Sequence, residues 1–260
     1  MTRPPLSARS VIASTLLGSD PPRLAGRLLV AIGEPFGIPR GTMRVALTRM
    51  VDRGELTNID GTYKLRGELL QRKERQNRTR APRHHRWDGW WHCAIVVPTG
   101  SRSAADRARL RSALSTMGFG EQREGVWMRP GDQLAPKTEF ADEQVEWYRL
   151  APLAMGDARS LARNLYLLDQ WADDARTLTA ELESATARLQ SAGDRIAHPT
   201  LAEAFVLDAA ARRLFLHDPR LPTELEPDDW PADELDRAFS RLDRSLGLSL
   251  RAFFAAVPRR

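Results

Sequence analysis

Residues 36–65 read FGIPRGTMRVALTRMVDRGELTNIDGTYKL, and this stretch decides the fold of the N-terminal third of the chain. Between Arg40 and Arg53 the apolar side chains of Met43, Leu47 and Met50 recur at helical spacing and predict one buried helix face. The residues that follow, 56–59 and 62–65, flank Asp60-Gly61, a dipeptide favoured in two-residue hairpin turns. The stretch therefore predicts a helix followed by a β-hairpin.

Two shorter helices are predicted upstream of this stretch. Ser7 is suited to cap a helix that ends near Gly18, and the apolar residues of that segment lie at helical spacing. Leu24, Leu28 and Ile32 repeat every four residues and predict a second short helix. Three helices and a hairpin within about 60 residues predict a winged helix-turn-helix, whose recognition helix, here 40–53, enters the major groove of DNA.

The outward side of the predicted recognition helix supplies candidate DNA contacts. Base edges are assigned to Arg40, Thr42, Arg44 and Thr48, because arginine bonds guanine bidentately and threonine offers a hydroxyl and a methyl. Phosphates are assigned to Arg49, Arg53 and Lys64, and Tyr63 of the hairpin joins the predicted DNA-binding set. The alternative is an exposed basic helix in a small domain that binds no nucleic acid.

The charge of the chain is concentrated in its first third. Residues 1–92 carry 17 Lys or Arg against 8 Asp or Glu, a net charge of +9, whereas residues 93–260 carry 22 against 26, a net charge of −4. Phosphate contacts supply much of the affinity of proteins for nucleic acid. The distribution favours a polyanionic partner for the first domain alone, with a solvated basic surface as the alternative.

The remaining sequence predicts a change of architecture after residue 66. Residues 66–86 hold eight Lys or Arg and predict a linker or a helix continuing from the hairpin. Strands at 92–97, at 122–128 with a break at Gly125, and at 145–150, with a helix at about 104–117, predict a small αβ sandwich on an antiparallel sheet. Long apolar stripes between residues 158 and 254 predict a helical third region. The predicted domains are therefore 1–66, a basic linker at 67–86, 87–155 and 156–260.

Several protein classes are excluded by composition. No apolar run approaches the roughly 20 residues of a membrane span, and residues 1–9 lack the pattern of a signal peptide, so we expect a cytoplasmic protein that does not contact membranes. The single cysteine, Cys93, excludes an internal disulfide, and its apolar neighbours predict a small buried side chain.

Three separated motifs resemble the PaaX-type repressors of phenylacetate catabolism. The first runs from Phe36 to Gly54, the second is Trp87-Asp88-Gly89-Trp90-Trp91-His92, and the third pairs residues 218–222 with Pro227-Asp228-Asp229-Trp230-Pro231. The resemblance implies an α+β multidomain fold with an N-terminal winged helix-turn-helix, a central ferredoxin-like domain similar to Cas2, and a C-terminal helical domain that forms a homodimer. It also implies release from double-stranded operator DNA by an aryl-CoA thioester such as phenylacetyl-CoA.

Two features depart from that family. Pro39 stands where the family usually has a serine before the recognition helix, and it cannot cap through a side chain. Only 16 residues separate Met128 from Val145, fewer than the family's second central helix normally occupies, which predicts an abridged central domain. Arg212 and Arg213 match a paired arginine of the family and are candidate contacts for coenzyme A phosphates, with an ion-pair role as the alternative.

Catalysis is not predicted. Cas2-like folds can cleave nucleic acid with acidic groups around a metal ion, but the strand at 92–97 contains no carboxylate, and the histidines show no metal-binding spacing. We therefore predict no catalytic residue, metal or cofactor. The alternatives are a metal-dependent nuclease of the Cas2 type and a DNA-binding protein without a ligand.

Overall fold

The structure is a computed structural model that describes residues 6–78, 87–97, 103–131, 144–151, 155–192 and 197–258. The chain forms two compact units. Unit 1 comprises Met1–Ala81, Ala175–His217 and Pro231–Arg260, and unit 2 comprises Pro82–Asp174 and Asp218–Trp230. Both units draw on segments that are distant in the sequence.

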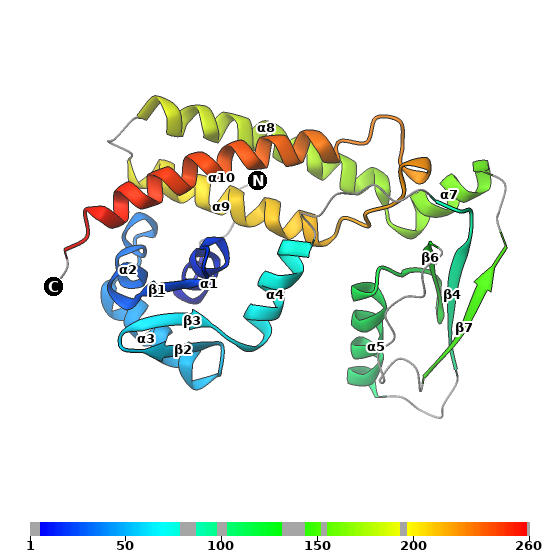
Figure 1. Cartoon of the computed structure of the whole chain (residues 1–260), viewed down its shortest axis with the longest axis horizontal. Helices are drawn as coiled ribbons and strands as arrows, with labels where there is room; N and C mark the ends of the chain where they lie inside the picture. The colour runs from blue at the N-terminus through cyan, green and yellow to red at the C-terminus, as the bar shows by residue number, and fades with distance from the viewer. Residues whose placement is uncertain are drawn as a thin grey trace. The chain divides into compact units, whose positions relative to one another are not determined.

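The N-terminal part of unit 1 has the elements predicted for a winged helix-turn-helix, in the predicted order. A three-stranded antiparallel sheet with the order β1-β3-β2 lies beside three helices (Figure 1). The elements are α1 (Ala8–Gly18), β1 (Arg23–Ala25), α2 (Gly26–Ala31), the 3-10 turn η1 (Glu34–Phe36), α3 (Arg40–Asp52), β2 (Leu56–Ile59) and β3 (Thr62–Leu65).

Local sequence signals account for most of these boundaries. Ser7 caps α1 by accepting a hydrogen bond from the backbone N–H of Ser10 at 3.2 Å. The hairpin turn has positive φ at both Asp60 (49°) and Gly61 (75°), as a two-residue turn of this kind requires. No side chain caps α3, because Pro39 occupies its N-cap.

The predicted start of the second helix was wrong. Leu24 belongs to strand β1, where it pairs with Tyr63 of β3, and α2 begins only at Gly26. Three apolar residues spaced four apart are compatible with one helix and also with a strand followed by a helix. Here residues 23–25 form a strand because they pair with the edge of β3.

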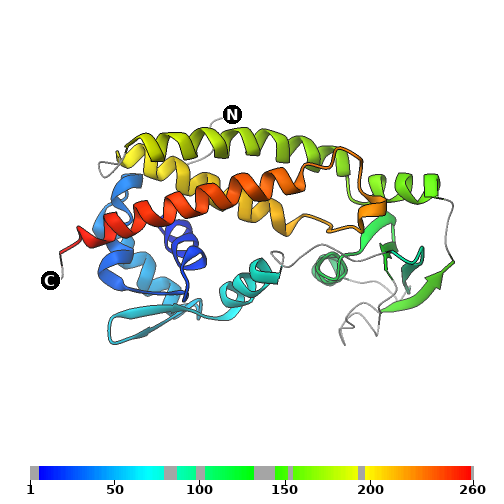
Figure 2. The same ribbon diagram turned by 45° about the horizontal axis from the view of Figure 1, so that its top comes forward.

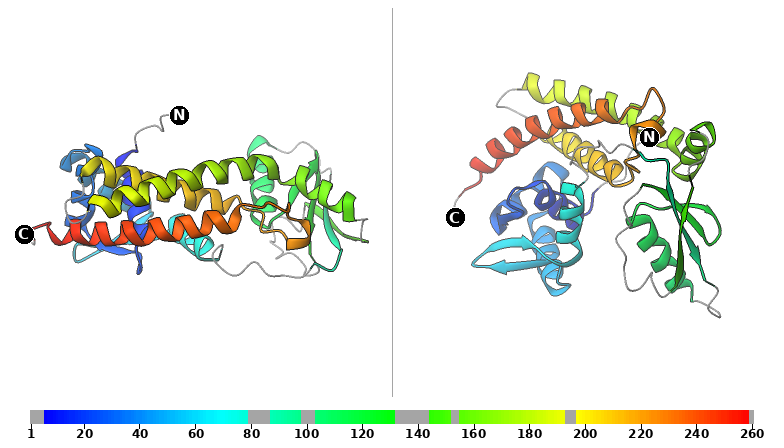
Figure 3. Two further views of the ribbon diagram at one scale, coloured as in Figure 1. Left: turned by 90° about the horizontal axis from the view of Figure 1, so that it is seen from above. Right: turned by 45° about the vertical axis from the view of Figure 1, so that its right-hand side comes forward.

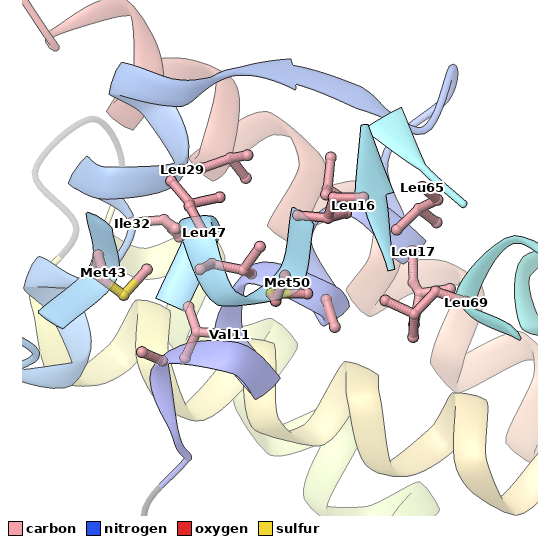
Figure 4. Close-up of a cluster of buried hydrophobic side chains, with 14 of the residues drawn as sticks. Val11, Leu16, Leu17, Leu29, Ile32, Met43, Leu47, Met50, Leu65 and Leu69 are labelled. Carbon is pink, nitrogen blue, oxygen red and sulfur yellow. The ribbon is translucent and has the colours of Figure 1, made fainter. Parts of the chain in front are cut away.

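The core of this part is built from the buried stripes of its helices (Figure 4). Met43, Leu47 and Met50 of α3 are buried, as the spacing predicts, and pack with side chains of α1 and α2. Leu69 joins them from α4 (Gly67–Arg78). The segment after the hairpin is thus helical over these residues, which was one of the two predicted alternatives.

Three long helices complete unit 1. They are α8 (Leu168–Ala192), which enters this unit at Ala175, α9 (His198–Leu216) and α10 (Ala232–Ala255). Figures 2 and 3 show them side by side, with α9 antiparallel to the other two. Pro199 lies in the first turn of α9, where a missing N–H costs no hydrogen bond.

The winged helix and the C-terminal helices pack into one unit. Phe36 of η1 lies edge-on to Phe205 of α9, with ring centroids 5.3 Å apart. Phe253 and Phe254, near the end of α10, pack against the winged-helix core. The Arg27 guanidinium of α2 also donates to the backbone carbonyl oxygens of Val257 and Pro258, each at 3.2 Å.

Unit 2 contains a four-stranded antiparallel sheet with the order β5-β6-β4-β7, which is the order of a ferredoxin-like sheet. The helix α5 covers one face and α7 packs against the other. Most of the short segment between Met128 and Val145, on which the prediction of an abridged domain rests, lies outside the described residues. The elements are β4 (Trp91–Val96), α5 (Ala104–Thr116), β5 (Gly120–Arg123), β6 (Val126–Pro130), β7 (Val145–Leu150) and α7 (Met155–Leu165).

Candidate nucleic-acid interface

The outward face of α3 is the candidate DNA-reading surface. Its opposite face is held in the core by Met43, Leu47 and Met50. Because successive residues of an α-helix turn by about 100°, the buried stripe fixes which residues point away from the protein. The predicted DNA-binding residues of this helix, Arg40, Thr42, Arg44, Thr48, Arg49 and the adjoining Arg53, are all exposed.

These residues occupy two flanks of the outward face. Arg40 and Arg44, four residues apart, lie on one flank, and Thr48 continues this row toward the centre of the face. Thr42, Arg49 and Arg53 fall on the other flank. The structure therefore separates the predicted set into two rows.

The arginines of both flanks are available to a partner. Within the described part of the chain, Arg40, Arg44, Arg49 and Arg53 form no ion pair or side-chain hydrogen bond. The nearby carboxylate of Glu55 is occupied by the Arg9 guanidinium at 2.9 Å. An exposed row of unpaired guanidinium groups is chemically suited to bind phosphate and the acceptor groups of guanine.

The hairpin places its two predicted residues on different faces. Tyr63 shares a face with the buried Leu65, is half-buried and packs against the core, while Lys64 faces the other way. The close approach of Tyr63 to Gly26 leaves no room for a side chain there, since a β-carbon would lie 2.7 Å from the Tyr63 ring. Lys64 is therefore the better placed of the two for phosphate.

Sequence reasoning missed three residues of this surface. Arg23 of β1 pairs in register with Lys64, which brings two cations together on the sheet. Gly41 and Val45 lie between the two flanks of α3, and both are exposed. The spacing i, i+4 and i+7 from Gly41 to Thr48 is the signal for this central line, but a prediction that rests on charged and hydroxyl side chains does not include Gly41 and Val45.

Arg212 and Arg213, the predicted ligand contacts, point into different surroundings. The Arg212 side chain is 11% exposed and forms ion pairs with Asp208 at 2.7 Å and with Asp243 at 2.5 Å. Burial alone would lower the pKa of Arg212, but the two carboxylates outweigh it and raise the pKa above its ordinary value. Arg213 is exposed on α9. This geometry supports the ion-pair alternative for Arg212.

The first strand of the central sheet has no acidic side chain that could hold a metal ion. Strand β4, Trp91 to Val96, has no carboxylate, and Cys93 is 5% exposed with a thiol pKa raised by burial. Among the described residues, nowhere do three or more His, Cys, Asp or Glu side chains gather closely enough to hold a metal ion.

Every described helix is too short or too polar to serve as a membrane span.

Three family models match the chain in succession. A model of the PaaX-like protein matches residues 7–69, the PaaX central Cas2-like domain matches 84–153, and the PaaX-like C-terminal domain matches 166–256. Among solved structures, the uncharacterized protein Rv0674 from Mycobacterium tuberculosis is 35% identical. That match covers 95% of this chain and 98% of the other, with a TM-score of 0.73. A search of curated proteins returned no match.

The three domain matches follow one another in the order of the winged helix, the ferredoxin-like sheet and the C-terminal helices described above. The chain belongs to the PaaX family.

Proposed function

We propose that this protein is a sequence-specific, DNA-binding transcriptional regulator that acts in the cytoplasm as a dimeric repressor. The observation that carries the proposal is the outward face of α3, whose four arginines are exposed and unpaired within the described residues. Membership of the PaaX family supports a regulator of phenylacetic acid catabolism. A dimer would present two copies of α3 to DNA half-sites spaced by about 34 Å or a multiple of it.

The effector of the proposed repressor is an aryl-CoA thioester such as phenylacetyl-CoA, as family membership suggests. Such a ligand releases DNA only if it binds the DNA-free conformation more tightly than the DNA-bound one. Because Arg212 is already paired with two carboxylates, Arg213 is the more accessible of the two candidate phosphate contacts.

Fluorescence anisotropy on duplex DNA from upstream of the protein's own coding region tests this proposal. We expect binding that is tighter than to random DNA, weakens steeply with salt, and is released by an aryl-CoA thioester. Equal affinity for random DNA would contradict a specific regulator, and cleavage of the same duplex with added Mg²⁺ would favour the nuclease alternative. Specific binding that no thioester releases would favour a DNA-binding protein without this effector.

Two substitutions on opposite flanks of α3 test the roles assigned to them. Arg44→Ala should cost about 1 to 3 kcal/mol on the selected sequence and relax base preference at one position. Arg53→Ala should weaken binding to all sequences alike and reduce the salt slope by about one. Equal losses for both variants on selected and random duplexes would contradict this division of roles.

A further inference from the structure

An apolar line runs along the centre of the outward face of α3. Gly41, Val45 and Thr48 are spaced i, i+4 and i+7, and their directions average almost opposite to the buried stripe. Val45, at the centre of this line, is 51% exposed. The apolar part runs from Gly41 to Thr48, about two helical turns, and the exposed Asp52 follows it on the same side of the helix.

The packing of the protein does not require a glycine at position 41. A β-carbon built on Gly41 meets no atom within 4 Å, so no close approach within the chain demands a glycine there. Valine and glycine also have lower helix propensity than alanine. Because Gly41 and Val45 favour neither helix formation nor core packing, they point to a role in binding a partner.

Thr48 adds an apolar group to the same line. Its hydroxyl donates to the backbone carbonyl oxygen of Arg44 at 3.3 Å. With the hydroxyl directed back to the helix, the methyl group is what Thr48 offers to a partner. The central line of α3 is therefore apolar although its flanks are cationic.

The flanking charges identify the partner as duplex DNA. Arg44 lies on one side of Val45 and Arg49 on the other, both exposed and unpaired within the described residues. A helix held between two rows of phosphates presents its central line to the base edges. The apolar group that the major groove displays is the C5-methyl of thymine.

We propose that Val45 reads a thymine by contacting its C5-methyl group, and that Gly41 allows the first turn of α3 to approach the base pairs closely. This inference rests on the proposed function, because it needs a duplex in front of α3. It assigns part of the base preference to a residue without a hydrogen-bonding side chain.

A deoxyuridine scan of the DNA tests the contact. The full-length protein first selects its preferred duplex from a random pool, and each thymine is then replaced singly by deoxyuridine, which lacks only the methyl. For the wild-type protein we expect one thymine per half-site at which the replacement weakens binding about four-fold, the value of one buried methyl. In Val45→Ala that penalty should disappear while the penalties at other thymines remain.

Two further variants control for general weakening. Arg53→Ala should lower affinity for the thymine and the deoxyuridine duplexes by the same factor and keep the penalty. Val45→Thr, which retains one methyl, should keep part of it. Alanine favours helix formation more than valine at an exposed position, so Val45→Ala is expected to fold.

Gly41→Ala separates DNA binding from stability. The added methyl meets open space in the free protein, so thermal stability should be unchanged or higher. Binding to the selected duplex should be weaker, and binding as tight as that of the wild type would overturn the role of Gly41.

The outcomes distinguish this inference from the proposed function. A deoxyuridine penalty that persists in Val45→Ala, or no such penalty at any thymine, would overturn the Val45 contact although selection of a preferred duplex had succeeded. Failure to select any preferred duplex would instead overturn the proposed function, and the inference with it.

Discussion

Arg212 shows how one residue can match a family position and still have a local structural role. Its guanidinium lies between Asp208, four residues earlier on α9, and Asp243 on α10, and it stacks over the Phe239 ring with 5.0 Å from its central carbon to the ring centroid. The Asp208 side chain is 9% exposed and that of Asp243 34%, and a buried carboxylate such as Asp208 requires a partner because an unpaired charge away from water is strongly unfavourable. Arg212 therefore joins α9 to α10.

Replacing Arg212 should consequently lower the stability of the protein. Arg212→Ala removes the guanidinium that bonds the buried Asp208 carboxylate and the half-buried Asp243, and we expect it to lower the free energy of unfolding by about 3 kcal/mol in urea titrations. The matched control is Arg213→Ala, whose exposed side chain predicts a change within about 0.5 kcal/mol. Similar stabilities for the two variants would show that the pairing contributes little.

At the level of secondary-structure elements, a close approach between β5 and α7 depends on a glycine. A β-carbon at Gly120 would lie 2.8 Å from the backbone carbonyl oxygen of Leu165 and 2.9 Å from its β-carbon. The backbone atom cannot rotate away as a long side chain can, so any side chain at position 120 must push the strand from the helix end. The glycine lets α7 pack against the sheet of unit 2.

The same substitution at two glycines should therefore have opposite effects. Gly120→Ala should lower the free energy of unfolding by about 1 to 3 kcal/mol, because the added methyl overpacks the contact. Gly247→Ala, in the interior of α10 with its nearest neighbour 3.7 Å away, should raise stability by up to about 1 kcal/mol. Chemical denaturation of both variants measures the difference, and a neutral Gly120→Ala would show that the strand and helix can separate at little cost.

Across the whole chain, the N-terminal winged helix and the C-terminal helices form one unit. The contact between Phe36 and Phe205 joins the turn before α3 directly to α9. The hydrogen bonds of Arg27 join α2 to the end of α10. A change in the packing of α9 and α10 would therefore act directly on η1 and α2, which adjoin the candidate DNA-reading helix.

Weakening this junction should destabilise both parts together. Phe205→Ala removes a ring that is 4% exposed and should cost about 3 to 5 kcal/mol. Hydrogen exchange should then show faster exchange in α2 and α9 by a similar factor. Phe205→Leu, which keeps most of the volume, should have a smaller effect on both helices. Faster exchange confined to α9 would contradict a shared unit.

The candidate reading surface is predictable in part from the spacing of residues along the chain. The helix at 40–53 is observed as α3, and the spacing of its core stripe placed the six predicted side chains of this segment on the exposed side. The same spacing also places Val45 at the centre of this face, but exposed apolar residues are ordinarily assigned no role. The half-burial of Tyr63 depends on its approach to Gly26 and is absent from the hairpin pattern.

Local signals were sufficient wherever a structure depends on near neighbours along the chain. The cap at Ser7, the stripe of α3, the Asp60-Gly61 turn and the strand β7 need only the residues beside them, so they follow from the amino-acid sequence alone. Only tertiary packing establishes that Leu24 joins a strand, that Arg212 meets Asp243, and that α9 packs on η1. These contacts join residues 31 to 169 positions apart in the printed sequence, and no local period records which distant surface a side chain will meet.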